Sequence, residues 1–172
     1  HDVVNPEAIN LTLDPGLAFG TGSHPSTHLC IEWMIKNIKE NNVVLDYGCG
    51  SGILAICAKK LGANNVVGVD IDPQAIIASE QNAKSNQTDI TFKNSQEKLI
   101  IQADLIVANI LSSALKVLAP ALANYCLPNG KIALSGILKH QESEIRDIYS
   151  EWFVMQDSDY KDGWVCLSGE KV

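Results

Sequence analysis

The sequence predicts an α/β fold built on a mostly parallel, doubly wound sheet. Apolar runs of strand length alternate with segments of helical periodicity along the chain. One apolar run ends at Asp46 and is followed by three alternating glycines, Gly48, Gly50 and Gly52, and the next apolar run ends at Asp70. A strand, a glycine turn, a helix, a second strand and an acid in this order are typical of a nucleoside-binding site.

In the first half of the chain, periodicity and capping residues define the expected elements. Pro25 and Pro73 suit the first turns of helices, Asp72 suits an N-cap, and Gly62 suits the C-terminal end of a helix. The expected elements are a strand at 9–13, a glycine-rich loop at 14–23, helices at 25–39, 53–61 and 73–85, and strands at 43–46 and 66–70.

In the second half, residues 103–109 are apolar enough for a strand that is buried on both faces, and residues 140–152 show an amphipathic helical pattern. The other expected elements are strands at 90–92, 131–137, 153–156 and 163–169, a helix at 110–125 and a turn at 128–130. No helical pattern separates the last two strands, so we expect an antiparallel end to a seven-stranded sheet.

Composition limits the classes of function. The chain has 172 residues, enough for one domain, and is 46% hydrophobic and 19% charged, as expected for a globular protein. The net charge of −7 argues against a broad nucleic-acid footprint, which needs a basic surface, and suits a basic protein partner better. We expect neither a membrane span nor a signal peptide, because no apolar run is long enough and the N-terminus lacks the pattern.

Cysteine and histidine positions give no indication of a metal. The five cysteines form no Cys-x-x-Cys pair, so we expect neither zinc nor a disulfide framework, and a reducing cytoplasm fits. His24 and His28 lie one helical turn apart, but no further ligand completes a set. His24 is also considered as a proton acceptor, although a histidine at a helix start is more often a packing residue.

The spacing of the glycines helps to choose the cofactor. Dinucleotide sites read Gly-x-Gly-x-x-Gly, with the pyrophosphate on the helix N-terminus, whereas residues 46–52 read Asp-x-Gly-x-Gly-x-Gly. This pattern resembles the first motif of class I S-adenosylmethionine (SAM) methyltransferases. SAM carries no phosphate, and its sulfonium and ammonium groups are cations that suit a carboxylate such as Asp46. The pattern disfavours an NAD-dependent oxidoreductase, since neither the pyrophosphate spacing nor a hydride-handling group is evident.

Residues 13–27, 46–54 and 107–111 together resemble the catalytic domain of the PrmA family, bacterial methyltransferases of large-subunit ribosomal protein eleven; residues 134–138 and 163–164 also fit. The resemblance implies the class I SAM-dependent, Rossmann-like methyltransferase fold. That fold is a mostly parallel seven-stranded sheet with an antiparallel last strand and helices on both faces. SAM is the cofactor that it implies.

The resemblance also implies a set of site residues. Asn109 is the expected catalytic residue, since its side-chain carbonyl can accept a hydrogen bond from the attacking amine. Asp70 is expected to hold the ribose hydroxyls, and the loop from Phe19 to Ser23 is a candidate lid over SAM. The expected cofactor-binding residues are Phe19, Thr21, Thr27, Asp46, Gly48, Gly50, Asp70 and Asn109.

For function, the resemblance implies a transferase that methylates lysine side chains and N-terminal α-amines of ribosomal protein eleven in the cytoplasm. Residues 1–172 are expected to form a single catalytic domain without the family's N-terminal substrate-recognition domain. Two alternatives stay open: a SAM-dependent lysine methyltransferase of another protein, as in the related enzymes of electron-transfer flavoprotein, and a SAM-binding domain that is inactive without its recruiting domain. Direct nucleic-acid methylation is disfavoured, because Asn109-Ile110-Leu111 lacks the Asn-Pro-Pro-Tyr pattern.

Overall fold

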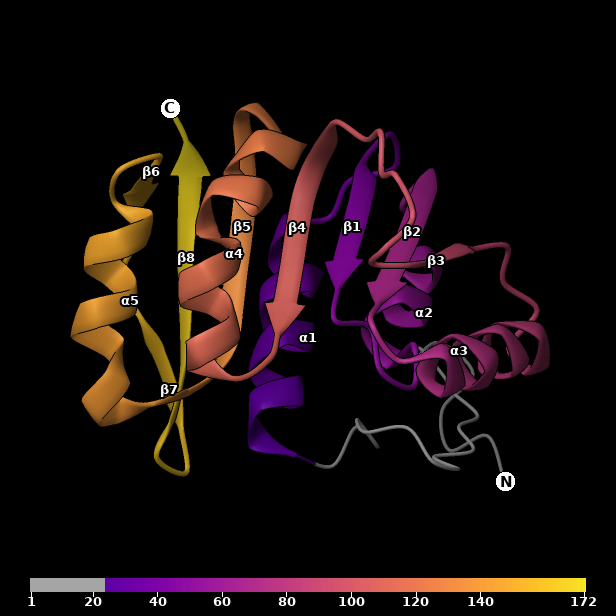
Figure 1. Cartoon of the computed structure of the whole chain (residues 1–172), viewed down its shortest axis with the longest axis horizontal. Coiled ribbons are helices and arrows are strands. Elements are labelled where there is room, and N and C mark those ends of the chain that lie inside the picture. The colour runs from indigo at the N-terminus through magenta and orange to yellow at the C-terminus, as the bar shows by residue number, and fades with distance from the viewer. Residues whose placement is uncertain (1–23) are drawn as a thin grey trace.

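The computed structural model describes residues 24–172, which fold around one mixed sheet. The strand order is β3-β2-β1-β4-β5-β8-β6, and β7 pairs with β8 beside this path (Figure 1). The strands are β1 (Val43–Tyr47), β2 (Asn65–Asp70), β3 (Thr91–Asn94), β4 (Ala103–Asn109), β5 (Cys126–Leu138), β6 (Phe153–Met155), β7 (Asp159–Lys161) and β8 (Trp164–Lys171).

Strands β1 to β5 are parallel, and β8 runs antiparallel to each of its neighbours β5, β6 and β7. The predicted sheet, mostly parallel with an antiparallel last strand, is therefore confirmed. The strand count differs from the expected seven, because the short strand β7 forms a hairpin with β8 that the sequence pattern does not reveal. The strand order reverses at β1 and β4, so the carboxyl ends of these two strands flank the crevice where α/β sheets bind ligands.

Helices cover both faces of the sheet. In Figure 1, α4 and α5 lie in front of it and α1 lies behind it. The helices are α1 (Pro25–Asn37), α2 (Ile53–Lys60), α3 (Pro73–Ser85), α4 (Ser112–Tyr125) and α5 (Glu142–Tyr149), with a short 3-10 turn at Lys139–Gln141. The predicted caps are confirmed: Asp72 accepts a hydrogen bond from the Gln74 amide, and Gly62 follows α2 with φ +105°.

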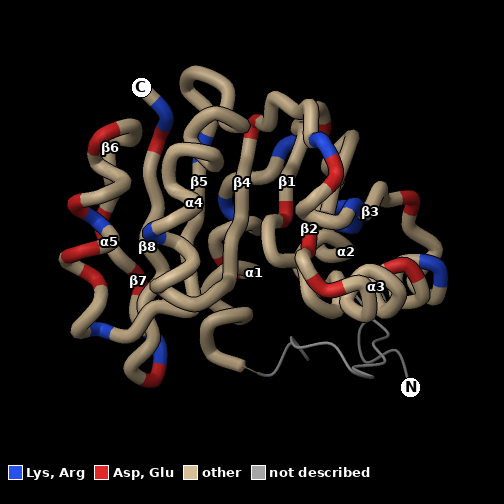
Figure 2. Tube along the Cα trace, viewed as in Figure 1, with Lys and Arg blue, Asp and Glu red and all other residues tan. Residues whose placement is uncertain are grey.

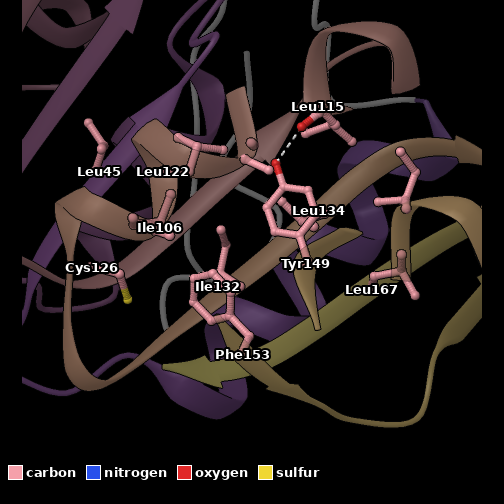
Figure 3. Close-up of a cluster of buried hydrophobic side chains, with 14 of the residues drawn as sticks. Leu45, Ile106, Leu115, Leu122, Cys126, Ile132, Leu134, Tyr149, Phe153 and Leu167 are labelled. Atoms are coloured by element: carbon pink, nitrogen blue, oxygen red, sulfur yellow. Dashed lines mark hydrogen bonds between the residues drawn. The ribbon is translucent and has the colours of Figure 1, made fainter. Parts of the chain in front are cut away.

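Alternation along the strands divides the core between the two faces. Val44 and Leu105 pack with α1 and α2, whereas their neighbours Leu45 and Ile106 pack with α4 and α5 (Figure 3). Because successive strand residues point to opposite faces, a strand covered on both sides must be apolar throughout. The prediction that 103–109 is such a strand is confirmed, since only its two polar residues, the second and the last, are incompletely buried.

Most element boundaries differ from the expected ones by one or two residues, and β5 and α5 differ by more. Strand β5 begins at Cys126 instead of residue 131, because Cys126 already pairs with Ala103. The expected turn at 128–130 is a bulge inside this strand, where Asn129 has φ +66°. The expected helix at 140–152 is shorter: α5 covers Glu142–Tyr149, and Phe153 already pairs with Lys171 of β8.

The five cysteines are all buried and unpaired by disulfides, as expected for small core residues. No helix among residues 24–172 has the length and apolar character needed to cross a bilayer.

Tyr149 makes the only hydrogen bond drawn in the core view of Figure 3, from its hydroxyl to the Leu115 carbonyl oxygen at 2.8 Å. The side chain is fully buried, and burial raises its pKa, so the hydroxyl keeps the proton that it donates. The bond joins α5 to α4, where Pro120 interrupts the helical hydrogen-bond ladder.

We predict that Tyr149→Phe lowers the free energy of unfolding by about 1–2 kcal/mol, because it removes this buried bond without changing the ring packing. Urea denaturation followed by circular dichroism measures the change. Tyr160→Phe is the matched control, since the exposed Tyr160 hydroxyl bonds Glu142 at the surface and its loss should cost less. Equal losses in the two variants would contradict the role given to Tyr149.

Candidate cofactor and amine site

The glycine turn lies at the carboxyl end of β1 and is fixed to β2. The amides of Gly48 and Cys49 donate to the Val69 carbonyl oxygen at 2.7 and 2.9 Å, and the Gly50 amide donates to Asp70 Oδ2 at 2.9 Å. Gly48 and Gly50 adopt φ +82° and +55°, conformations that glycine reaches without steric cost. The turn is therefore set by backbone geometry.

Gly48 has a second reason to be glycine. A Cβ added at this position would overlap Ile110 Cγ2, far inside van der Waals contact. Ile110 follows β4, so the missing side chain of Gly48 lets the exit of β4 approach the turn after β1. Since β1 and β4 pair in parallel, Asn109 and the glycine turn lie at the same crevice, and the Ile110 side chain packs against the turn.

Asp70 lies at the end of β2, as predicted, and both of its carboxylate oxygens accept backbone hydrogen bonds. Oδ2 accepts from Gly50 and Oδ1 accepts from Asp72 at 3.0 Å. Each oxygen has a further lone pair, and the side chain is only half-buried. Asp70 therefore orders the turn and can still accept hydrogen bonds from a diol.

Asp46 lies beneath the turn and is almost fully buried, with 1% exposure. Its Oδ2 accepts from the Ala55 amide at 3.1 Å, in the first turn of α2, where the N-cap Gly52 has no side chain to do so. Among residues 24–172, Asp46 Oδ1 is a buried side-chain oxygen without a hydrogen bond. Burial, opposed by the Ala55 amide and assisted by the charge of Asp70, raises the pKa of Asp46 to about 7.

Helix α3 supports the turn through two residues that the sequence analysis missed. Ser79 Oγ donates to the Gly50 carbonyl oxygen at 2.7 Å, and Asn82 Nδ2 donates to the Ser51 carbonyl oxygen at 2.9 Å. Both side chains are buried. Their three-residue spacing on the helix is the signal that could have identified them, because it places two polar residues on one face of α3.

Asn109 and Thr27 lie far apart in sequence and meet at the site. Asn109 Nδ2 donates to Thr27 Oγ1 at 3.3 Å, and beside them Ser135 Oγ donates to the Ser26 carbonyl oxygen at 2.9 Å. The side-chain nitrogen of Asn109 makes the bond to Thr27, and its carbonyl oxygen is the acceptor atom of the same group. The amide is therefore oriented by its nitrogen and keeps its acceptor for another group.

His24 is the N-cap of α1: its Nδ1 accepts from the Ser26 amide at 3.2 Å and lies 2.7 Å from Ser26 Oγ. Its ring packs against that of Trp164 in a T-shaped arrangement, with centroids 4.7 Å apart and planes at 70°. His24 is thus a packing and capping residue, the more common of the two roles considered for it. Within residues 24–172, no cluster of histidine, cysteine and acid side chains could hold a metal ion.

The described structure brings the predicted site residues together in two adjoining groups. One contains Asp46, Gly48, Gly50 and Asp70 around the turn, and the other contains Thr27 and Asn109 at the start of α1. Phe19 and Thr21, with the candidate lid at 19–23, lie outside the described residues. Figure 2 shows acidic positions near the end of β2, where Asp70 and Asp72 lie, so the end of this strand suits a cationic ligand.

Comparison with known proteins identifies the family. Residues 1–172 match the model of ribosomal protein L11 methyltransferase (PrmA), and the chain belongs to this family. The ribosomal protein L11 methyltransferases of Methylobacillus flagellatus and Dechloromonas aromatica are 57% and 54% identical over 171 residues. These matches cover 99% of the chain but 58% of each relative, so the chain spans less than two thirds of their length.

Solved structures confirm the predicted fold class. The ribosomal protein L11 methylase of Lactobacillus delbrueckii subsp. bulgaricus superposes with a TM-score of 0.92 at 34% identity, covering 99% of this chain and 90% of that one. The N-methyltransferase NodS of Bradyrhizobium japonicum, with a TM-score of 0.70 and 12% identity over 87% of this chain and 89% of that one, shares the fold alone. The architecture is that of class I SAM methyltransferases.

We predict that Gly48→Ala lowers the free energy of unfolding by about 2–5 kcal/mol, because the new Cβ adds left-handed backbone strain and a clash with Ile110. Gly163→Ala is the matched control: Gly163 has φ +81°, but a Cβ added there would meet nothing within 4 Å, so only the strain remains. Urea denaturation compares the two variants. Indistinguishable losses would contradict the close approach of Ile110.

We predict that Asp46→Asn flattens the pH dependence of stability. The folded protein retains the Asp46 proton up to about pH 7, whereas the unfolded chain releases it near pH 4, so stability falls as the pH rises between these values. Asparagine cannot ionise and removes this contribution, which amounts to roughly 2–3 kcal/mol between pH 5 and pH 8. Urea titrations of both proteins at the two pH values measure it, and parallel pH profiles would refute the raised pKa.

Proposed function

As a member of this family, the chain carries, we propose, the catalytic machinery of a SAM-dependent protein N-methyltransferase that acts on amines of ribosomal protein L11. The observation that carries the proposal is the pairing of two groups in one crevice: the glycine turn with Asp70, and Asn109 oriented by Thr27. The names of the relatives support the substrate. Residues 1–172 are proposed to be a single catalytic domain.

The turn group is proposed to bind SAM. Asp70 accepts hydrogen bonds from the ribose hydroxyls, and the backbone of Gly48 and Gly50 lets the cofactor approach closely. Asp46 lies below with an unpaired oxygen, and a bound sulfonium or ammonium nearby favours its ionised form. When bound, SAM supplies an activated methyl group; the protein contributes orientation and the exclusion of water.

The second group is proposed to position the substrate amine. Asn109 Nδ2 is engaged by Thr27, so Oδ1 can accept a hydrogen bond from an N–H of the amine and direct its lone pair toward the methyl group. The amine must be neutral to attack. A lysine with a pKa near 10.4 costs roughly 4–5 kcal/mol to deprotonate at pH 7, and an α-amine with a pKa near 8 costs about 1.

This difference makes the N-terminal amine the easier target, and lysine requires a drier pocket. Both are proposed as substrates, in agreement with the family pattern. The acidic net charge and the acidic positions around the site suit a basic protein such as a ribosomal protein, and the cytoplasm is the proposed compartment. We propose no direct contact with nucleic acid or membrane.

The competing proposal is that the chain binds SAM but transfers no methyl group by itself. The observation in its favour is coverage: the curated relatives are longer, and the chain matches 58% of their length. Substrate recruitment is a separate task from catalysis, and another part of a longer protein can perform it. Measurements of SAM binding and of methyl transfer distinguish the two proposals.

We predict that calorimetric titration of the 172-residue chain detects SAM at a micromolar dissociation constant and no binding of NAD. Asp70→Ala should weaken SAM binding about 10- to 100-fold, because hydrogen bonds to a carboxylate are lost. Asp89→Ala, an exposed acid outside the site, is the control and should bind like the unmodified chain.

Methyl transfer is then measured with methyl-labelled SAM and ribosomal protein L11, and the modified residues are identified by mass spectrometry. Labelling of L11 supports the full proposal. Saturable SAM binding without labelling favours the competing proposal of a domain that needs its recruiter. A folded chain that does not bind SAM would refute both.

A further inference from the structure

We propose that Trp164 is the aromatic wall of the subsite that receives the substrate amine, and that it selects cationic, methylated amines through its ring face. This inference rests on the proposed function and names a specificity-determining residue for it. Trp164 begins β8 and is half-buried.

Strand alternation places Trp164 on the same face of the sheet as Asn109. The residues two positions away along their strands, Val107 and Cys166, pack against the α1 side of the sheet. Side chains two apart in a strand share a face, so Asn109 and Trp164 also face α1. Asn109 pairs with Ser135 of β5, and Trp164 pairs with Leu138, which lies three residues further along the same strand.

The first turn of α1 and its N-cap contact Asn109, Ser135 and Trp164. Thr27 bonds Asn109, the Ser26 carbonyl oxygen accepts from Ser135, and the His24 ring packs against Trp164. Figure 1 shows the beginning of α1, the end of β4 and the β7–β8 hairpin at the same edge of the molecule. Trp164 and the residue proposed to hold the amine therefore lie on the two strands that flank β5, and both contact the start of α1.

The hairpin that carries Trp164 is held on its other side by α5. The Tyr160 hydroxyl donates to the Glu142 carboxylate at 2.7 Å, and Ser158 Oγ bonds the same carboxylate at 2.8 Å. Arg146 completes the group by donating to the Gln156 carbonyl oxygen at 2.9 Å. With His24 on one side and this cluster on the other, the indole is positioned before any substrate arrives.

An aromatic wall matches the chemistry of repeated methylation. Lysine and methyllysine reach the site as cations. Each added methyl group removes an N–H that could donate a hydrogen bond to Asn109 Oδ1. A fully methylated ammonium has no donor left, but it is still attracted to the face of an indole. Trp164 would therefore keep affinity for partly methylated amines while they turn between transfers.

The test is a binding experiment on the 172-residue chain saturated with S-adenosylhomocysteine. Two probes are compared: a short peptide containing trimethyllysine, and the same peptide with the neutral tert-butyl isostere of that side chain. The shapes are alike and only the charge differs. We expect the unmodified chain to bind the charged peptide roughly 3- to 30-fold more tightly.

Trp164→Leu should reduce this preference to about one, and Trp164→Phe should restore part of it, because phenylalanine keeps an aromatic face. Trp152→Leu is the matched control: Trp152 is also partly buried, but it packs against the core on the α4 and α5 side and should leave the preference unchanged. The S-adenosylhomocysteine affinity of each variant verifies that the cofactor site remains folded.

An unmodified chain that binds S-adenosylhomocysteine but shows no preference for the charged peptide would overturn the inference. A preference that survives in Trp164→Leu would also overturn it, since the discrimination would then come from other residues. Failure of the unmodified chain to bind S-adenosylhomocysteine is a different result, which refutes the proposed function itself.

Discussion

The close approach of Ile110 to Gly48 is the constraint on which the rest of the site depends. A parallel sheet whose strand order reverses between β1 and β4 leaves a crevice there, but the width of that crevice is set by side chains. Because Gly48 has none, the Ile110 side chain packs directly against the turn leaving β1. The glycine turn and Asn109 share one edge of the sheet, where the first turn of α1 bonds Asn109 through Thr27.

The same site contains a conflict between stability and chemistry. Asp46 occupies a buried place under the turn, completes the N-terminus of α2 through Ala55 and has one oxygen without a partner among residues 24–172. A hydrophobic residue there would avoid the desolvation of a carboxyl group. Asp46 is instead a carboxyl group with a raised pKa, and a cation bound at the turn would change its charge. Titratable groups with shifted pKa values are common at functional sites.

Local patterns determined most of what could be predicted. Gly48, Gly50, Asp70 and the Asp72 cap follow from turn and capping chemistry within a few residues, and the buried strand 103–109 follows from its composition. The Thr27–Asn109 bond could not be read in this way, because it depends on how distant segments pack, and the spacing of Ser79 and Asn82 on α3 shows a polar face but not its partners in the turn. The bulge in β5 and strand β7 were missed for the same reason, since pairing with a neighbouring strand decides both.

The position of β8 also has a consequence for the synthesis of the protein. The last strand of the chain lies inside the sheet, between β5 and β6, and the Thr27–Asn109 contact joins residues 82 positions apart. Until residues 164–171 have left the ribosome, β5 and β6 lack the strand that lies between them. Contacts between residues so far apart in sequence also form slowly. The sheet can therefore close between β5 and β6 only after residues 164–171 have been translated.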